Sequence, residues 1–261
     1  MKRTLSLILV AIMLLTATFA FASCGASEEF VVGITYFAPM NYMDDSGNLI
    51  GFETEFAQAV AKEIGMEIRF QEIDWDAKFT ELDSGNIDCI WNGMTIDDDR
   101  RAAAGISTPY MKNKQVLVVK ADKASSFNAD TPLTADITIV AETKSAGESV
   151  IAADDYLNDA TYTAVKDMTT ALMEVAGGTA DACVIDYVTA LGSIGEGTDY
   201  TNLVVVESMS FGEEEQYGIA FRKTDTELLA KVNAAIEKLA EDGTIRRIAE
   251  KYKLEDYILV G

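Results

Sequence analysis

Strand-like and helix-like segments alternate along most of this chain, and this alternation limits the possible folds more than any other feature. Residues 30–35 are rich in β-branched side chains, whereas residues 53–64 carry apolar side chains at helical spacing. A strand over 67–73, a helix over 76–83 and an apolar strand over 87–91 are expected to follow. This order predicts right-handed βαβ units and mainly parallel sheets.

A second alternating series begins after a polar stretch at 121–132, which follows a β-rich run at 115–120. SGNIDCIWN (84–92) and GGTADACVID (177–186) both place small residues and an aspartate before a cysteine in an apolar strand, which suggests an internal duplication. The further expected strands are 137–141, 161–165, 181–185 and 217–222, and the further expected helices are 147–156, 168–176, 225–240 and 244–252.

Composition excludes several classes of function. The chain has 21 basic and 43 acidic residues, a net charge of −22, which disfavours binding to nucleic acid. It has no histidine, the commonest general base and zinc ligand. Cys89 and Cys183 lie in apolar strands, where small buried side chains are expected, so no disulfide framework is predicted.

The N-terminus has the pattern of an export signal. A positively charged start precedes an apolar run over residues 5–15, and Phe21-Ala22-Ser23-Cys24 is similar to a lipobox, in which the cysteine becomes the lipidated first residue. An uncleaved membrane anchor is the alternative. We expect residues 1–23 to be a lipoprotein-type signal peptide and 24–28 a tether that holds the rest of the chain outside the membrane.

The stretch DCIWNGMTIDDDR (88–100) places a polar turn and an arginine after a short apolar strand, and ISTPY (106–110) follows. Ligands of open α/β sheets bind at the carboxyl ends of strands. Arg100 offers a planar fork of donors suited to a carboxylate. The alternative is an ordinary strand–turn–helix with a surface arginine.

DCIWNGMTIDDDR with STPY resembles the signature of the polar-amino-acid family of bacterial extracellular solute-binding proteins, which feed ABC importers. Three other blocks are similar to family sequences and stand in the family's order: GFETEFAQAVAKEIG (51–65), YGIAFRK (217–223) and EDGTIRRIAEKY (241–252). The resemblance implies an α/β, two-lobed, periplasmic-binding-protein-like (type II) fold with mainly parallel sheets and a ligand cleft between the lobes. It implies lobe one over 29–118 plus 214–261 and lobe two over 119–213.

A free amino acid carries a carboxylate and an ammonium, and both need partners when they leave water. The resemblance implies that Arg100 meets the carboxylate and that the turn residues Asn92, Gly93 and Thr95 contact the ligand, with backbone groups and a hydroxyl for its two charged ends. It implies that Asp186, after the second cysteine-containing strand, meets the ammonium. The alternatives are a tight turn for Gly93 and a helix N-cap for Asp186.

The resemblance also implies carboxylate contacts from a Gly/Ser/Thr pair at the start of a lobe-two helix. Thr143 and Ser145 are the candidates, although Lys144 departs from the family pattern, and either residue can instead cap the helix. Phe37 matches a ring that covers the ligand side chain, and Trp75 matches a second ring facing it; core packing is the alternative for Phe37 and a helix-start hydrophobe for Trp75.

Family members that bind arginine, lysine, histidine or glutamine place a carboxylate three residues before the first ring, where this chain has Ile34. A cationic ligand side chain is therefore disfavoured, and an uncharged polar amino acid, glutamine-like or cystine-like, is expected. The acidic groups 97–99 and 213–215 are expected to be solvated, and residues 44–48 to form a β-turn rather than a calcium loop.

We therefore expect a monomeric, lipid-anchored receptor that lies outside the cytoplasm and passes a free amino acid to an ABC permease in the membrane. No cofactor, metal or nucleic acid is expected. Two other functions remain open: a small-acid dehydratase-type enzyme on the same scaffold, and an extracellular amino-acid sensor domain.

Overall fold

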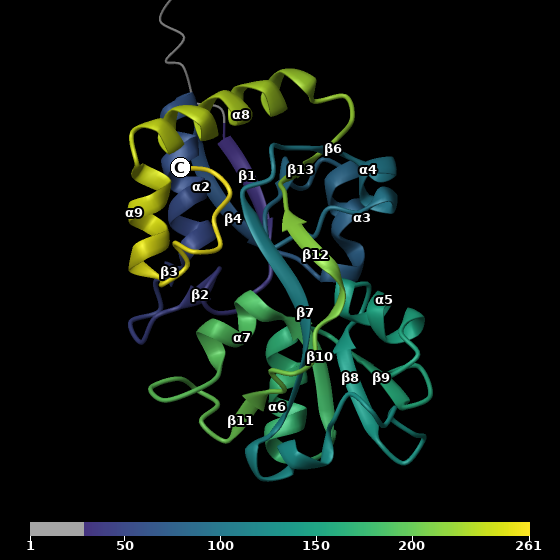
Figure 1. Cartoon of the computed structure of the whole chain (residues 1–261). Coiled ribbons are helices and arrows are strands. Elements are labelled where there is room, and N and C mark those ends of the chain that lie inside the picture. Colours follow the sequence, from purple (N-terminus) through teal and green to yellow (C-terminus); the bar gives the residue numbers. More distant parts are fainter. Residues whose placement is uncertain (1–28) are drawn as a thin grey trace, which may run out of the picture.

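The computed structural model describes residues 29–261 as two lobes, each a sheet with helices packed on it (Figure 1). The predictions of a signal peptide, a tether and lipidation at Cys24 concern residues 1–28 and lie outside this described part. Within residues 29–261, none of the helices has the length and apolar character that crossing a membrane requires.

Lobe one is built on a five-stranded sheet with the order β4-β1-β5-β13-β6. β1 is parallel to β4 and β5, whereas β13 is antiparallel to β5 and β6. The strands are β1 (Glu29–Ile34), β4 (Glu67–Glu72), β5 (Cys89–Ile90), β6 (Gly105–Ile106) and β13 (Ala220–Phe221), and the helices are α2 (Phe52–Ile64), the 3₁₀ helix η1 (Trp75–Ala77), α3 (Lys78–Asp83), α4 (Asp98–Ala103), α8 (Thr226–Glu241) and α9 (Thr244–Lys251).

Helix α2 shows how the sequence pattern becomes packing. Its apolar face buries Phe52, Phe56 and Val60 in the main core of lobe one. Gly65 ends the helix in a left-handed conformation (φ +75°), which glycine adopts without steric cost. Before this helix, β2 (Tyr42–Met43) and β3 (Leu49–Ile50) form a hairpin whose turn is held by Asp44, as expected for a β-turn.

Lobe two is built on a sheet with the order β11-β7-β10-β8-β9, and β12 pairs with β7. Helix α5 packs on one face of the sheet with Ile151, and α6 packs in a separate core with Met168 and Leu172. The strands are β7 (Met111–Lys120), β8 (Thr138–Glu142), β9 (Thr161–Val165), β10 (Ala182–Asp186), β11 (Leu203–Val205) and β12 (Phe211–Tyr217), and the helices are the 3₁₀ helix η2 (Ala121–Ser126), α5 (Ala146–Ala153), α6 (Met168–Gly177) and α7 (Tyr187–Ser193).

The two lobes are joined by β7 and β12, which run side by side through the middle of the molecule (Figure 1). They are antiparallel, with Met111 opposite Tyr217, and their register shifts between Phe211 and Glu215. β7 pairs with β10 from Gln115 onward. The expected division at 118/119 therefore falls inside β7, and the exact lobe boundary stays a prediction.

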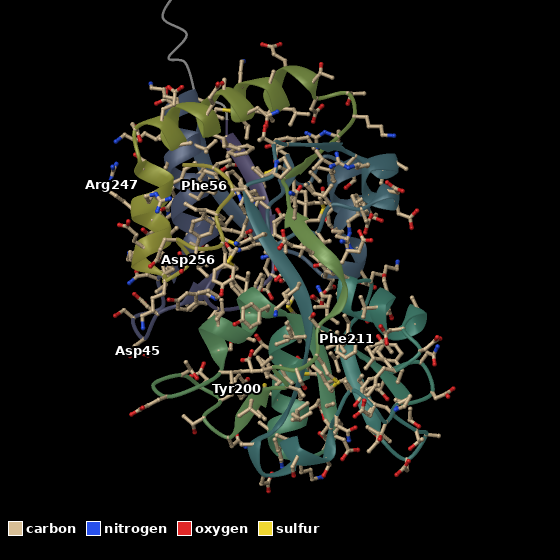
Figure 2. All side chains as sticks on the ribbon, in the orientation of Figure 1. Asp45, Phe56, Tyr200, Phe211, Arg247 and Asp256 are labelled. Atoms are coloured by element: carbon tan, nitrogen blue, oxygen red, sulfur yellow. The ribbon has the colours of Figure 1, made fainter. Side chains whose placement is uncertain are left out.

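The α/β two-lobed fold class is confirmed, but the sheets are mixed rather than mainly parallel. The parallel pairs come from βαβ units, as predicted, and the antiparallel pairs come from β6, β7, β11, β12 and β13. Side chains fill the space between helices and sheets in both lobes, with Phe56 inside one and Phe211 inside the other (Figure 2).

One expected strand is two strands in the structure. Residues 217–222 were predicted as continuous, but β12 ends at Tyr217 and β13 begins at Ala220. β12 pairs with β7 between the lobes, whereas β13 pairs within lobe one, so the chain changes partners at Gly218. A Cβ at Gly218 would lie 2.7 Å from Ile106 and 2.8 Å from Ile96, so this change of partners takes place in a closely packed site.

Candidate functional site

The turn that follows β5 is held from inside lobe one. The Asn92 side chain accepts a hydrogen bond from the Thr35 hydroxyl at 2.6 Å and donates to the Thr35 carbonyl at 3.0 Å. Gly93 has φ +56°, and a Cβ there would lie 3.2 Å from the Phe37 ring. Asn92 and Gly93 therefore shape the turn, and the Asn92 side chain already has protein partners.

Glu53 lies beneath this turn and is only 1% exposed. Its carboxylate accepts from the Gly93 N–H at 2.8 Å and from Asn41 Nδ2 at 3.0 Å, and also from the Tyr110 hydroxyl. Burial raises the pKa of Glu53 to about 7, although these hydrogen bonds favour the ionised form. Glu53 thus fixes the position of the turn.

Arg100 lies in α4, in the first turn after the exposed Asp97, whose side chain caps the helix. Arg100 is 7% exposed. Its Nη1 donates to the Thr95 carbonyl at 2.8 Å and lies 3.3 Å from the Asp97 carboxylate. Its Nη2 donates at 3.5 Å to the carbonyl of Lys144, which belongs to lobe two. The arginine is therefore buried in the cleft, not on the surface.

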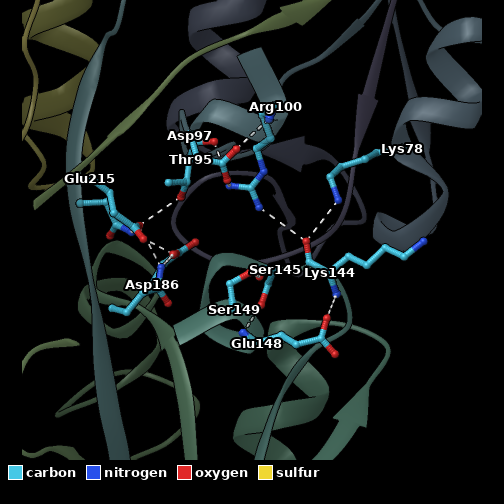
Figure 3. A network of polar contacts seen from close by, with 12 residues as sticks. Lys78, Thr95, Asp97, Arg100, Lys144, Ser145, Glu148, Ser149, Asp186 and Glu215 are labelled. Carbon is cyan, nitrogen blue, oxygen red and sulfur yellow. Dashed lines mark hydrogen bonds and ion pairs between the residues drawn. The ribbon is translucent and has the colours of Figure 1, made fainter. Parts of the chain in front are cut away.

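A second cation converges on the same carbonyl oxygen. Lys78 is 3% exposed, and its Nζ donates to the Trp75 carbonyl at 3.0 Å and to the Lys144 carbonyl at 3.3 Å. The amine lies 4.5 Å from the centre of the Trp75 ring. Burial, and then the nearby Arg100 charge, lower the pKa of Lys78 to about 8. Figure 3 shows both cations pointing at the Lys144 backbone.

Asp186 lies at the carboxyl end of β10 and is 4% exposed. Although Asp186 precedes α7, its side chain makes no capping hydrogen bond. It accepts instead from Asn113 Nδ2 at 2.8 Å and from Gln115 Nε2 at 2.5 Å, both on β7. Burial, and then the charge of Glu215, raise the pKa of Asp186 to about 7.

Glu215 was expected to be solvated, and this prediction is wrong. Its Oε2 accepts from the Thr95 hydroxyl at 3.0 Å and from the amides of Asn113 and Gln115 at 2.9 Å each. One carboxylate on β12 therefore joins the Thr95 turn of lobe one to the amides around Asp186 (Figure 3). Its neighbours Glu213 and Glu214 are exposed, as expected.

Glu142 is a further buried acid that the sequence reasoning missed. It ends β8, is 2% exposed, and its Oε1 has no hydrogen-bond partner among residues 29–261. Burial raises the pKa of Glu142 well above its usual range, and the charge of Asp186 raises it further. The charges of Lys78 and Arg100 act in the opposite direction.

The other predicted site residues have local roles. Thr143 donates from its hydroxyl and its N–H to the Val165 carbonyl. Ser145 caps α5 by accepting from the Glu148 N–H at 3.1 Å. Phe37 and Trp75 are 3% and 4% exposed and belong to different apolar clusters, and their roles around a ligand stay predictions.

Contacts between the lobes extend beyond these charges. The Thr169 hydroxyl donates to the Tyr36 carbonyl at 3.2 Å, and the Ser193 hydroxyl to the Ala38 carbonyl at 3.4 Å. With the bonds from Arg100 and Lys78 to the Lys144 carbonyl, these contacts describe a closed arrangement of the lobes.

Two features of the sequence point to the residues that were missed. Lys78 stands one helical turn after Trp75, and Glu142 ends an apolar strand at the same edge as Asp186. The predicted residues that the structure links in one polar network are Thr95, Arg100 and Asp186, together with the unpredicted Lys78, Asn113, Gln115 and Glu215.

Two lobes, two crossing strands and a closed cleft with buried cations on one wall and buried acids on the other define a two-lobed solute-binding protein. The chain belongs to the bacterial extracellular solute-binding proteins, family 3, because the model of that family matches residues 30–255. The resemblance seen in the sequence is thereby confirmed. This family includes amino-acid-binding proteins of ABC importers that act outside the cytoplasm.

Three proteins illustrate what this chain is similar to. The L-cystine-binding protein TcyJ of Escherichia coli (strain K12) is 31% identical over 220 residues, 83% of this chain and 79% of TcyJ. A substrate-binding protein of an ABC uptake transporter from Streptococcus pneumoniae, with bound histidine, is 30% identical with a TM-score of 0.77, covering 88% of this chain and 94% of that one. AncCDT-1, an ancestral amino acid-binding protein and precursor of cyclohexadienyl dehydratase, is 30% identical with a TM-score of 0.74, covering 86% and 95%.

Proposed function

We propose that this protein captures a free amino acid between its lobes and delivers it to an ABC permease. The observation that carries the proposal is the burial of Arg100 on lobe one and Asp186 on lobe two in one polar network (Figure 3). A ligand with a carboxylate for Arg100 and an ammonium for Asp186 spans both lobes. We infer an uncharged polar ligand, glutamine-like or cystine-like, because Ile34 stands where binders of cationic amino acids place a carboxylate and because TcyJ is an L-cystine-binding protein.

The Lys144 carbonyl suggests how the ligand carboxylate is held. It accepts a hydrogen bond from Arg100 Nη2 at 3.5 Å, so an oxygen from lobe two already lies where the guanidinium can bind an acceptor. A ligand carboxylate has more charge than a carbonyl and forms stronger hydrogen bonds with guanidinium. Since the ligand contacts both lobes only when they are shut, binding favours the closed state.

The tether is part of the same proposal. We propose that Cys24, in the lipobox-like group, is lipidated and holds the protein at the outer face of the cell membrane, as a monomer beside its permease. Metabolic labelling with a palmitate analogue, compared between the wild type and Cys24→Ala, tests this part separately. Equal labelling of both proteins would contradict it.

A dehydratase-type enzyme is the second candidate, favoured by the similarity to AncCDT-1 and by buried acids with raised pKa values, Glu142 and Asp186. We favour binding because the other relatives are substrate-binding proteins. Stoichiometric retention of an unchanged amino acid supports transport, whereas turnover of a small acid supports the enzyme.

The test of the main proposal is a thermal-shift screen of amino acids followed by calorimetry on Arg100→Ala. Loss of the guanidinium leaves a buried ligand carboxylate unpaired, so we expect binding to weaken by about 3–5 kcal/mol. Arg101→Ala is the matched control, since Arg101 is the exposed neighbour on the same helix. Equal affinity of Arg100→Ala and the wild type would exclude Arg100 from the site.

A further inference from the structure

Each lobe contributes two buried ionisable side chains at or beside the polar network, one more than a single amino-acid head requires. Lobe one contributes Arg100 and Lys78, which are 7% and 3% exposed. Lobe two contributes Asp186 and Glu142, which are 4% and 2% exposed. One α-carboxylate and one α-ammonium balance the charge of only one cation and one acid, so a single head brings no opposite charge for the other two buried ionisable groups.

The second cation and the second acid do not neutralise each other. No ion pair joins Lys78 to Glu142 among the nine found in residues 29–261. Lys78 Nζ bonds only to main-chain carbonyls, and Glu142 Oε1 bonds to nothing in the described chain. Because a buried charge or polar atom without a partner is costly, a ligand that supplies both partners gains free energy at this place.

We propose that the ligand is two-headed, a diamino dicarboxylic acid such as cystine, with its second carboxylate at Lys78 and its second ammonium at Glu142. This inference rests on the proposed function, in which Arg100 and Asp186 hold the first head. Trp75 adds a neutral donor beside Lys78, since its Nε1 is buried without a partner and the Lys78 amine lies over its ring.

Other classes of ligand side chain are less favourable partners for Lys78 and Glu142. A lysine or arginine side chain donates to Glu142 but leaves Lys78 facing a like charge, and a glutamate side chain has the reverse defect. A glutamine side chain supplies one donor and one acceptor, but hydrogen bonds between two ionised groups are about twice as strong as neutral ones. Of these classes, only the two-headed ligand gives an opposite charge to all four buried groups.

Calorimetry at pH 7.5 on the purified protein tests the inference with four ligands: cystine and cystathionine have two heads, and S-methylcysteine and glutamine have one. We expect the wild type to bind the two-headed ligands about 100-fold more tightly than S-methylcysteine. We expect Lys78→Met and Glu142→Gln each to weaken cystine binding about tenfold or more and S-methylcysteine binding less than about threefold. Lys114→Met is the matched control, because the Lys114 amine also lies over a ring, at 4.7 Å from that of Tyr187, but outside this network.

Three outcomes would overturn the inference and leave the proposed function in place. They are equal losses for cystine and S-methylcysteine in Lys78→Met, glutamine binding as tight as cystine binding, and no preference for two heads in the wild type. The comparison of ligands on the wild type needs no variant, so it decides the question even if a substitution unfolds the protein. Failure of every amino acid to bind would instead remove the proposed function.

Discussion

Strand β5 of lobe one and strand β10 of lobe two are built alike but end differently. Cys89 of β5 is paired with Val32 of the parallel strand β1, and Cys183 of β10 is paired with Val140 of the parallel strand β8. Both cysteines are buried and free. The similarity of SGNIDCIWN and GGTADACVID is thus a similarity of structure as well as of sequence.

In each lobe, an aspartate joins the strand to its parallel neighbour by the same pair of hydrogen bonds, which we call a clamp. Asp88 donates from its N–H to the Val31 carbonyl at 2.8 Å and accepts from the Val31 N–H at 2.8 Å. Asp181 donates to the Thr138 carbonyl at 2.9 Å and accepts from the Thr138 N–H at 3.0 Å. The scaffold that brings a strand end to the cleft is therefore repeated in the two lobes.

The residues after each strand make the two lobes different. β5 runs into the turn that leads to Arg100, supported from below by Glu53, whereas β10 ends in Asp186, held by amides of β7. The same strand arrangement therefore presents a cation on lobe one and an acid on lobe two. A few side chains determine whether each lobe presents a positive or a negative charge, and the repeated strands determine where that charge lies.

Removing Glu53, which supports the turn of lobe one, should produce the largest loss of stability. We expect Glu53→Ala to lower the free energy of unfolding by about 3 kcal/mol, because Gly93, Tyr110 and Asn41 lose a buried acceptor. Urea unfolding at pH 7 measures this. Glu53→Gln keeps one acceptor oxygen and should lose less. A loss below about 1 kcal/mol in Glu53→Ala would show that the turn does not depend on this carboxylate.

Local patterns in the sequence predicted most elements of both lobes and placed Arg100 and Asp186 at strand ends. They did not predict the burial of Glu53 or Lys78, because the groups that cover these side chains are distant in sequence. Gly93 is 40 residues from Glu53, and Lys144 is 66 residues from Lys78.

Glu215 shows the same limit at a finer scale. Three consecutive glutamates look like a solvated surface, and two of them are exposed. The third points into the polar network because β12 pairs with β7 in a register that brings it opposite Asn113. Register is a tertiary property, so the sequence pattern alone could not separate Glu215 from its neighbours.

Closure of lobe two on lobe one can be blocked without touching the charged groups. A Cβ at Gly192 of α7 would lie 2.5 Å from Pro39 N and 2.9 Å from the carbonyl carbon of Ala38, both backbone atoms of lobe one. We expect Gly192→Ala to disfavour the closed state by about 2 kcal/mol and to weaken ligand binding accordingly. Calorimetry measures the affinity, and small-angle scattering should show a more open ligand-bound state.

The matched control for this change is Gly177→Ala, since nothing lies within 4 Å of a Cβ at Gly177. If Gly192→Ala binds ligand as tightly as the wild type and Gly177→Ala, the contact between α7 and the Ala38-Pro39 segment does not take part in closure.

The acid on lobe two should make binding depend on pH. Burial, and then Glu215, raise the pKa of Asp186 to about 7, and the charge of Asp186 in turn raises the pKa of Glu142 on β8. Only ionised Asp186 holds an ammonium strongly, so a ligand must displace a proton below pH 7. We expect affinity to fall about tenfold, about 1.4 kcal/mol, from pH 7.5 to pH 6. Calorimetry in buffers of different ionisation enthalpy should show proton release at pH 6.

Glu215→Gln sharpens this test. Loss of the neighbouring charge should lower the pKa of Asp186 and shift the midpoint of the affinity profile to lower pH. An affinity that rises as the pH falls from 7.5 to 6 would contradict the assignment of Asp186 to the ligand ammonium.

The smallest expected effect compares the two clamps directly. Asp88→Ala and Asp181→Ala each remove one acceptor for a backbone N–H, worth about 1 kcal/mol. Asp88 also pairs at 3.0 Å with Arg222, and both side chains are about a quarter exposed, whereas the partner of Asp181, Lys123 at 3.3 Å, is 54% exposed. Since exposed pairs contribute little, Asp88→Ala should cost about 1 kcal/mol more than Asp181→Ala in urea unfolding. Equal losses would mean that the two clamps are equivalent in energy as well as in geometry. Arg222 would then keep its position without Asp88, through its hydrogen bonds to the carbonyls of Leu82 and Ile87.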